Sequence, residues 1–201
     1  VSYLWHKEAD LKQSDLVVLP GGFAHGDYLR AGAIARFSPV MKEVIRFAGN
    51  GGQVLGICNG FQVLCEARLL PGALVKNQHQ TFICKNLPVQ CTNPDSTLTS
   101  GLEQDEILHL PVAHGEGRYV AHRQTLDQLW EKEQVLLQYA QPDDQYGNPN
   151  GSADAIAAIS NEKGNVTGIM PHPERASEAI VGNTDGARLL EPYLQALLTL
   201  T

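Results

Sequence analysis

Short apolar runs alternate with helical patterns of apolar residues in the first third of the chain. The run at 15–19 is β-branched and stops at Pro20, as expected for a buried strand. Ser38 can cap a helix whose first position is Pro39. The pattern predicts, in order, a strand over 15–19, a helix over 39–48, a strand over 53–58 and a helix over 60–70. This alternation indicates a parallel sheet covered by helices.

The remainder of the chain predicts shorter elements. They are strands over 81–83, 87–91, 106–112, 135–140, 155–160 and 166–170, a helix over 126–133 and an amphipathic helix over 185–200. Residues 141–152 are rich in Asp, Asn, Gly and Pro and indicate a loop. No internal repeat interrupts this order. We therefore expect a single α/β domain over residues 1–201 with a mostly parallel sheet.

The charge of the chain and the lengths of its apolar segments argue against nucleic-acid and membrane partners. The 201 residues carry a net charge of -7 with only 15 Lys and Arg and no basic run, which argues against nucleic acid as a partner. No apolar stretch is long enough to cross a membrane, and the first ten residues lack the layout of a signal peptide. We expect no membrane partner and a cytoplasmic location.

The four cysteines show no zinc-type Cys-x-x-Cys spacing and no disulfide density, so the sequence predicts neither a metal site nor a disulfide scaffold. Three of them, Cys65, Cys84 and Cys91, are interpreted as buried or half-buried free thiols.

Cys58 differs from the others because glycines flank it at two residues on each side, Gly56 and Gly60, where a predicted strand meets a predicted helix. A nucleophile elbow requires this pattern, since the tight turn brings these positions into collision. The helix that follows stabilises a thiolate and offers free backbone N–H groups. The competing interpretation is a buried cysteine at a glycine-rich turn.

The segment after the predicted strand 166–170 offers a base and a group to orient it. His172 would lie just beyond the carboxyl end of that strand, where open α/β sheets place their sites. Prolines on both sides of His172 predict an extended segment in which Glu174 points to the same side. The sequence therefore predicts a Cys58–His172–Glu174 triad. By itself, the segment could also be a surface loop.

Two further glycine-rich segments, 21–27 and 113–117, follow predicted strands. Gly21 and Gly22 end the first strand, and an amide from this loop together with that of Asn59 would form an oxyanion hole, although an ordinary turn explains the glycines equally well. Two other histidines lie in such loops: His25 and His114 could each line a site or only turn a corner.

In combination, these segments resemble the triad-type (class I) glutamine amidotransferases. More narrowly, the chain is similar to the family of glutaminase subunits of phosphoribosylformylglycinamidine synthases. The resemblance covers nearly the whole chain and rests on five blocks: 19–23 (LPGGF), 26–38 (GDYLRAGAIARFS), 58–62 (CNGFQ), 111–117 (PVAHGEG) and 170–175 (MPHPER).

The resemblance implies a three-layer, flavodoxin-like fold and a glutaminase activity. Glutamine would be attacked by Cys58 and held in part by Gln62, Gly21 and His114, with Gly22 and Asn59 as the oxyanion hole. Ammonia would pass to a synthetase subunit that uses ATP and magnesium to convert formylglycinamide ribonucleotide into formylglycinamidine ribonucleotide. A small third subunit would bridge the two, and no cofactor would bind to this chain itself.

The family has an additional strand, glycine turn and helix before the segment that matches residues 1–11. From this difference we expect the domain to be incomplete at its N-terminus and to lack the first strand–helix unit of the fold. Two other functions compete with the amidotransferase: a cysteine peptidase or hydrolase of related fold, and a non-catalytic interaction module. The peptidase alternative does not explain the block at 28–38.

Overall fold

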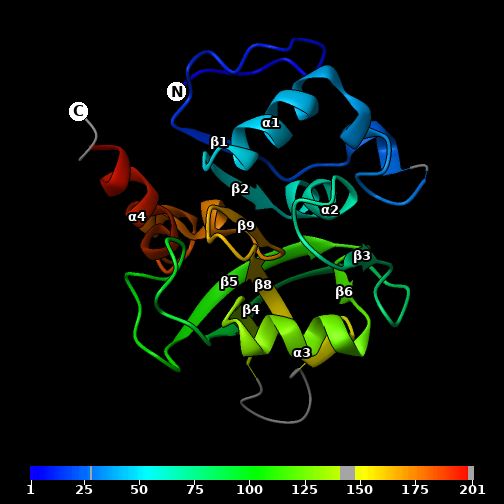
Figure 1. Ribbon diagram of the computed structural model, residues 1–201. Helices are drawn as coiled ribbons and strands as arrows, with labels where there is room; N and C mark the ends of the chain where they lie inside the picture. Colours follow the sequence, from blue (N-terminus) through cyan, green and yellow to red (C-terminus); the bar gives the residue numbers. More distant parts are fainter. Residues whose placement is uncertain (28, 141–147, 199–201) are drawn as a thin grey trace.

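The computed structural model describes residues 1–27, 29–140 and 148–198 (Figure 1). Within them the main sheet has seven strands in the order β1-β2-β9-β8-β7-β4-β5. Its strands are β1 (Leu16–Leu19), β2 (Gln53–Ile57), β4 (Ile83–Cys91), β5 (Ile107–His114), β7 (Val135–Tyr139), β8 (Ile156–Ser160) and β9 (Val166–Ile169). A separate two-stranded sheet pairs β3 (Ala73–Val75) with β6 (Arg118–Val120).

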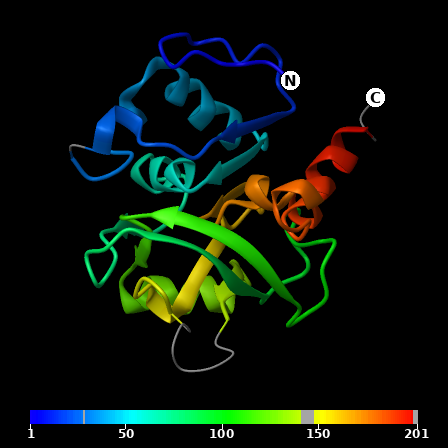
Figure 2. The same ribbon diagram turned by 180° about the vertical axis from the view of Figure 1, so that it is seen from behind.

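Four α-helices surround the main sheet in the part of the chain described. They are α1 (Pro39–Gly49), α2 (Asn59–Glu66), α3 (Arg123–Glu131) and α4 (Ala187–Leu198). The 3-10 helices are η1 (Ala24–Asp27), η2 (Ala35–Phe37), η3 (Ala153–Ala155), η4 (Pro173–Ala176) and η5 (Ala179–Val181). Both ribbon views place α1 and α2 beside β1 and β2, and α3 at the opposite end of the molecule (Figures 1 and 2).

The sheet is mixed rather than mostly parallel. Strands β1, β2 and β9 pair in parallel, whereas the pairings among β9, β8, β7, β4 and β5 are antiparallel. The cause lies in the connections: a parallel pair needs a crossover of a dozen residues or more, and the short link from β8 to β9 permits only an antiparallel return. The predicted parallel arrangement therefore holds where β1, β2 and β9 meet.

Most predicted elements are present, with different limits. The two predicted strands at 81–83 and 87–91 form the single strand β4, and the helix predicted over 60–70 is α2, which ends at Glu66 before Arg68 takes a φ of 60°. The predicted loop 141–152 lies outside the described residues over 141–147, as do residues 199–200 of the last predicted helix. The strands β3 and β6 and the 3-10 helices were not predicted, because elements of three or four residues are too short to show a hydrophobic periodicity.

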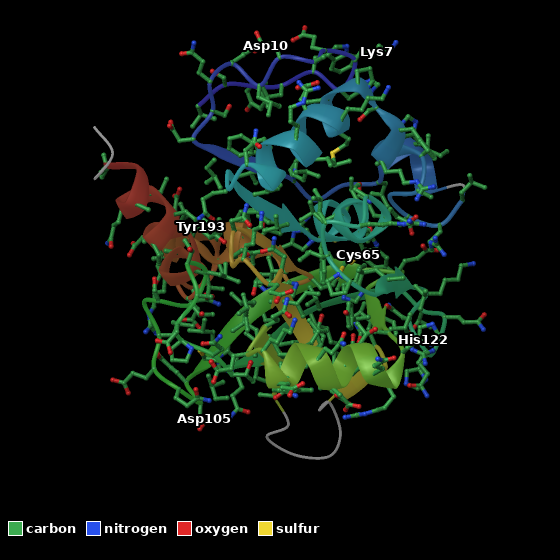
Figure 3. All side chains as sticks on the ribbon, viewed as in Figure 1. Lys7, Asp10, Cys65, Asp105, His122 and Tyr193 are labelled. Carbon is green, nitrogen blue, oxygen red and sulfur yellow. The ribbon has the colours of Figure 1, made fainter. Side chains whose placement is uncertain are left out.

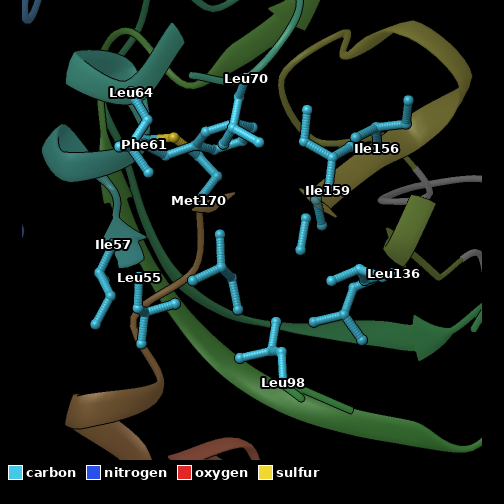
Figure 4. Packing of buried hydrophobic residues seen from close by; sticks show 14 of the residues in the cluster. Leu55, Ile57, Phe61, Leu64, Leu70, Leu98, Leu136, Ile156, Ile159 and Met170 are labelled. Carbon is cyan, nitrogen blue, oxygen red and sulfur yellow. The ribbon is translucent and has the colours of Figure 1, made fainter. Parts of the chain in front are cut away.

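The core is continuous from the parallel strands into the antiparallel part of the sheet. Phe61 and Leu64 of α2 are fully buried and lie beside Leu70 and Met170 (Figure 4). Gly168 on β9 makes room for this packing, because a Cβ atom there would stand 2.1 Å from the ring of Phe61. Burying each such large side chain contributes roughly 1.5–3 kcal/mol, so α2 is firmly anchored to the sheet.

The side-chain view places Cys65 in the interior on α2, while Lys7 and Asp10 lie at the outer margin of the N-terminal segment (Figure 3). No helix in the described residues combines the length and apolar character that crossing a membrane requires.

Candidate active site

The parallel strands deliver three predicted catalytic segments to one edge of the sheet. Leu19 on β1 pairs with Gly56 on β2, and Ile57 on β2 pairs with Ile169 on β9. The ladder continues one step further, since the backbone N–H of Cys58 donates to the carbonyl of Ile169 at 2.8 Å. The segments that follow these strands therefore meet at their carboxyl ends, as the sequence predicts.

Cys58 has the strained backbone of a nucleophile elbow, with φ 50° and ψ -105°. Both flanking glycines are required because neighbouring backbone atoms approach them too closely to admit a side chain. A Cβ atom on Gly56 would lie 2.7 Å from the backbone of Gly60, and one on Gly60 would lie 2.0 Å from the carbonyl oxygen of Leu19. These contacts confirm the predicted reason for the two glycines, because a side chain at either position would push strand and helix apart.

His172 is almost completely buried and has a defined hydrogen-bond partner. Its Nδ1 lies 2.6 Å from Oε1 of Glu174. Because a carboxylate only accepts, Nδ1 carries the proton in the neutral ring and Nε2 carries the lone pair. That Nε2 makes no hydrogen bond within the described residues. A base with one nitrogen oriented and the other open is the arrangement needed for proton transfer.

The pairing of His172 with Glu174 is as predicted, but its structural reason differs. The segment is not extended past His172, because Pro173 begins the 3-10 helix η4 and the N–H of Arg175 donates to the carbonyl of His172 at 3.1 Å. This turn brings Glu174 back toward the ring. The backbone N–H of His172 is itself fixed by the carbonyl of Pro111 on β5, at 2.8 Å.

A cavity of about 210 Å³ opens beside Cys58. It is lined by Gly22, Phe23, Cys58, Gln62, Phe82, Ala113, His114, Gly115, Glu116, His172 and Arg175. Cys58 and His172 thus share one cavity. The thiol sulfur lies 4.0 Å from the carbonyl oxygen of Ala113 on β5. Phe23 and Phe82 are the exposed aromatic residues of this lining, with ring centroids 6.5 Å apart.

Gly21 lies beside the imidazole of His172 and is not among the residues that line the cavity. A Cβ atom there would stand 2.7 Å from Cε1 of His172 and 3.6 Å from Cβ of Cys58. The same point is therefore flanked by the side chains of Cys58 and His172. A side chain at position 21 would displace the imidazole, so this glycine provides space for the ring.

A chain of hydrogen bonds ties the cavity walls together. The amide of Ala24 donates to Oδ1 of Asn59, whose Nδ2 donates to Oε1 of Gln62, and Nε2 of Gln62 donates to the carbonyl of Glu116. The side chain of Gln62 thus has a protein partner at each end. A second tie runs from the amide of Ala31 to Oε2 of Glu116, at 3.2 Å.

Arg30 and Arg36, which follow Gly22 in the chain, are bonded to the C-terminal end of α2. Glu66 is buried and accepts from both Nε and Nη2 of Arg30, and its backbone carbonyl accepts from Arg36. Gly32, with φ 79°, lies against the backbone of α2, where a Cβ atom would stand 2.8 Å from the amide of Val63. These contacts hold residues 30–36 against α2.

His114 is the second buried imidazole of the cavity. Asn77 donates its Nδ2 hydrogens to two carbonyls, so its Oδ1 accepts, and the Nδ1 of His114 at 3.1 Å is the donor. The Nε2 of His114 therefore carries a lone pair, and it has no partner in the described residues. Burial first, and the nearby His172 second, lower the pKa of His114 to about 4.

The other cysteines and histidines lie apart from this cavity. Cys65 and Cys91 are buried, as expected, and burial raises the pKa of both thiols, that of Cys91 to about 11. Cys84 is exposed, contrary to expectation, because its position on β4 faces outward. His25, which the sequence left open, contacts His6 and does not line the cavity.

Six residues that line the cavity were given no role from the sequence: Phe23, Phe82, Ala113, Gly115, Glu116 and Arg175. Glu116 and Arg175 stood within the blocks of the family resemblance, but a single charged residue in a glycine-rich or proline-rich loop gives no periodic signal. Only the folded arrangement shows that they share a cavity with Cys58.

Comparison with known proteins shows the family to which the chain belongs. The family model of the CobB/CobQ-like glutamine amidotransferase domain matches residues 1–192, so the chain belongs to that family. Within this family, the chain groups with the glutaminase subunits of phosphoribosylformylglycinamidine synthase, an enzyme of purine biosynthesis. This grouping confirms the narrower resemblance and argues against the peptidase alternative.

Two relatives and one solved structure carry this grouping. The subunit PurQ of phosphoribosylformylglycinamidine synthase from Salinibacter ruber is 50% identical over 195 residues, which are 96% of this chain and 83% of the relative. PurQ from Gloeobacter violaceus is 52% identical over 198 residues, covering 97% and 85%. The structure of PurLQS from Thermotoga maritima matches with a TM-score of 0.83 and 41% identity over 93% of this chain and 82% of that one. The predicted α/β amidotransferase-like fold is thereby confirmed.

Proposed function

We propose that this chain hydrolyses glutamine to glutamate and ammonia through a triad of Cys58, His172 and Glu174. The single observation that carries the proposal is the buried imidazole of His172, which donates from Nδ1 to Glu174 and keeps Nε2 open in the cavity it shares with Cys58. A thiol at a strained elbow, beside an oriented base, is the arrangement of a cysteine nucleophile.

In the first step the thiolate of Cys58 attacks the side-chain carbonyl carbon of glutamine, and the carbonyl π electrons move to oxygen. The backbone amides of Gly22 and Asn59 stabilise this oxyanion. When the tetrahedral intermediate collapses, the C–N bond breaks and the protonated Nε2 of His172 gives its proton to the leaving nitrogen. Ammonia and a glutamyl thioester result, with a neutral imidazole.

In the second step Nε2 of His172 takes a proton from water while the water oxygen attacks the thioester carbonyl. The C–S bond breaks, glutamate leaves, and the sulfur returns as a thiolate paired with the imidazolium. Glu174 keeps the proton on Nδ1 throughout and stabilises the imidazolium that forms in each cycle.

Three residues act on the substrate in this proposal. His114 accepts an N–H of the carboxamide at its Nε2, which favours glutamine over glutamate because a carboxylate has no N–H to donate. Gln62 acts on the substrate indirectly. Its side-chain amide is bonded to Asn59 and to the carbonyl of Glu116, and so it holds the residues that line the cavity in place. Gly21 serves by admitting the imidazole of His172 next to the substrate.

The ammonia is delivered to a synthetase subunit, with a small bridging subunit in the same complex. This part of the proposal draws on the similarity to the PurLQS structure. The synthetase would bind ATP and magnesium and convert formylglycinamide ribonucleotide into formylglycinamidine ribonucleotide, so the present chain needs no cofactor. The cytoplasmic location stays a prediction.

The test is glutamate release from glutamine, with and without the synthetase partner, by wild type and Cys58→Ala. We expect release by wild type and a loss of at least about 10³-fold in the variant, because the substitution removes the proposed nucleophile. Undiminished partner-dependent release by Cys58→Ala would overturn the mechanism. Absence of release by wild type in the assembled complex would favour a non-catalytic module.

A further inference from the structure

Gly22, which carries one of the two proposed oxyanion donors, is not held by packing. A Cβ atom at this position would meet nothing within 4 Å, and the neighbouring Phe23 is exposed. Gly21 differs, since the imidazole of His172 lies against it. A backbone donor stabilises an oxyanion well only if it is fixed before the reaction, so the amide of Gly22 needs support from another contact.

One hydrogen bond joins residues 22–27 to another segment in the part of the chain that the structure describes. The backbone N–H of Ala24 donates to Oδ1 of Asn59 at 3.2 Å. Only two planar peptide units separate the amide of Ala24 from that of Gly22, so a bond that fixes the first restricts the position of the second.

Asn59 supplies both the anchor of this segment and the second proposed donor. It is the first residue of α2, and the first bond of that helix runs from the N–H of Gln62 to the carbonyl of Cys58, at 3.2 Å. The N–H of Asn59 is therefore not used by the helix. The backbone N–H and the side-chain oxygen of one residue thus set the spacing between the two donors.

The side chain of Asn59 has one orientation that satisfies its bonds. Nε2 of Gln62 donates to the carbonyl of Glu116, which only accepts, so Oε1 of Gln62 accepts from Nδ2 of Asn59, at 2.7 Å. Oδ1 of Asn59 is thereby turned toward the N–H of Ala24, which only donates. Asn59 and Gln62 are both buried, so water does not compete for these bonds.

We propose that the side chain of Asn59 is a positioning group of the oxyanion hole. It ties the segment that carries the Gly22 amide to the first turn of α2, and so fixes the distance between the two backbone donors. This inference rests on the proposed glutaminase function and gives the side chain of Asn59 a role of its own, beside that of its backbone N–H.

The experiment removes the bond between Asn59 and Ala24 from each side. Asn59→Leu keeps the approximate shape of the side chain but neither accepts nor donates. Ala24→Pro removes the N–H, and proline is tolerated at the first position of a helical turn, where Ala24 begins η1. Ala24→Ser, which keeps the N–H, and Asn50→Leu, at an exposed position outside the cavity, are the matched controls.

Each variant, and the double variant, is assayed in the assembled complex for glutamate release from glutamine. We expect Asn59→Leu and Ala24→Pro each to lower kcat by about 10–100-fold with KM within about twofold of wild type. The loss is smaller than the roughly 10²–10³-fold of a donor removed outright, because a donor is only displaced. The double variant should be within about twofold of the slower single variant, since both changes break one bond. The controls should retain the wild-type kcat.

Two further measurements separate positioning from damage to the fold. Alkylation of Cys58 by iodoacetamide passes through no oxyanion, so its rate at each pH, followed by peptide mass mapping, should agree within about twofold between wild type and variants. Calorimetric binding of glutamine in a Cys58→Ala background should also change by less than about twofold, because the oxyanion exists only after attack.

Additive losses in the double variant would overturn the inference, because the two residues would then act separately. So would an unchanged kcat in Asn59→Leu, or losses that alkylation and binding share in proportion, since these indicate a general structural role. Should Ala24→Pro fail to fold, Asn59→Leu decides by the same three measurements. Any of these results beside normal turnover by wild type leaves the proposed function intact, whereas absence of turnover by wild type refutes that function and this inference with it.

Discussion

Ile57 on β2 pairs in parallel register with Ile169 on β9, so Cys58, the proposed nucleophile, follows one strand directly and His172 follows the other by three residues. This register is pinned by buried side chains on both strands, and a slip of one residue would turn each strand's core-facing side chains to the other face. The site thus depends on a strand pairing rather than on one loop.

The first prediction concerns the orientation of the base. Replacing Glu174 by Gln lets an amide N–H face Nδ1 of His172, which favours the tautomer with the proton on Nε2. We expect kcat for glutamine to fall by roughly 10²–10⁴-fold with little change in KM. Steady-state kinetics measure this. Glu178→Gln, an exposed carboxylate four residues on, is the control and should retain full activity. Equal activity of the two variants would contradict the role of Glu174.

The second prediction concerns the elbow. A methyl group at position 60 would lie 2.0 Å from the carbonyl oxygen of Leu19, so Gly60→Ala must shift β1 or α2. We expect a loss of about 1–3 kcal/mol in the free energy of unfolding, as for other overpacking changes, together with loss of glutaminase activity. Urea unfolding gives the first quantity.

Gly49 is the matched control, because a Cβ atom there meets nothing within 4 Å and the residue ends α1. Gly49→Ala should leave the unfolding free energy unchanged or raise it by a few tenths of a kcal/mol. If Gly60→Ala behaved like Gly49→Ala, the elbow would not be under steric constraint.

The third prediction concerns pH and His114. Its pKa is lowered to about 4 in the folded protein and is about 6.5 in an unfolded chain, so the unfolded state binds an extra proton between these values. The contribution of the neutral ring to stability is complete above about pH 6.5 and is lost as pH falls toward 4, by roughly 1.4 kcal/mol per pH unit.

Urea unfolding of wild type and His114→Gln between pH 7.5 and 4.5 measures this slope. We expect the wild type to lose stability relative to the variant on acidification, since the variant has no ring to protonate. NMR titration of the His114 imidazole in the folded protein is the direct check. A midpoint near 6.5 would show that burial does not keep this ring neutral.

The fourth prediction concerns the four thiols. A glutamine-analogue electrophile should modify Cys58 alone, whereas a general thiol reagent should also modify the exposed Cys84. Cys65 and Cys91 should react only after unfolding, because burial shields them and raises the pKa of each thiol. Peptide mass mapping gives the modified positions. Cys84→Ser should leave the labelling of Cys58 intact, and modification of Cys65 in the folded protein would contradict the packing of α2.

The local chemistry of the elbow was predictable from sequence. Gly56 and Gly60 flank Cys58 because strand, turn and helix are consecutive in the chain, and a collision over four residues can be read from spacing alone. The His172–Glu174 pair was also predictable, since only one residue separates the two. The turn that forms it was not, because a proline both ends an extended segment and begins a 3-10 helix.

The sequence by itself singled out Cys58 and its flanking glycines, predicted His172 and Glu174 as its partners, and gave the order of the strands that precede them. Only the tertiary structure decided that the sheet is mixed, that Pro111 on β5 fixes the backbone of His172, and that Glu116 and Arg175 face the same cavity as Cys58. The physical reason is range. Steric and capping rules act over a few residues, whereas the bond from His172 to Pro111 and the cavity shared by Cys58, Glu116 and Arg175 join segments more than fifty residues apart, whose positions depend on how the whole core packs. The strand directions depend likewise on which strands pair.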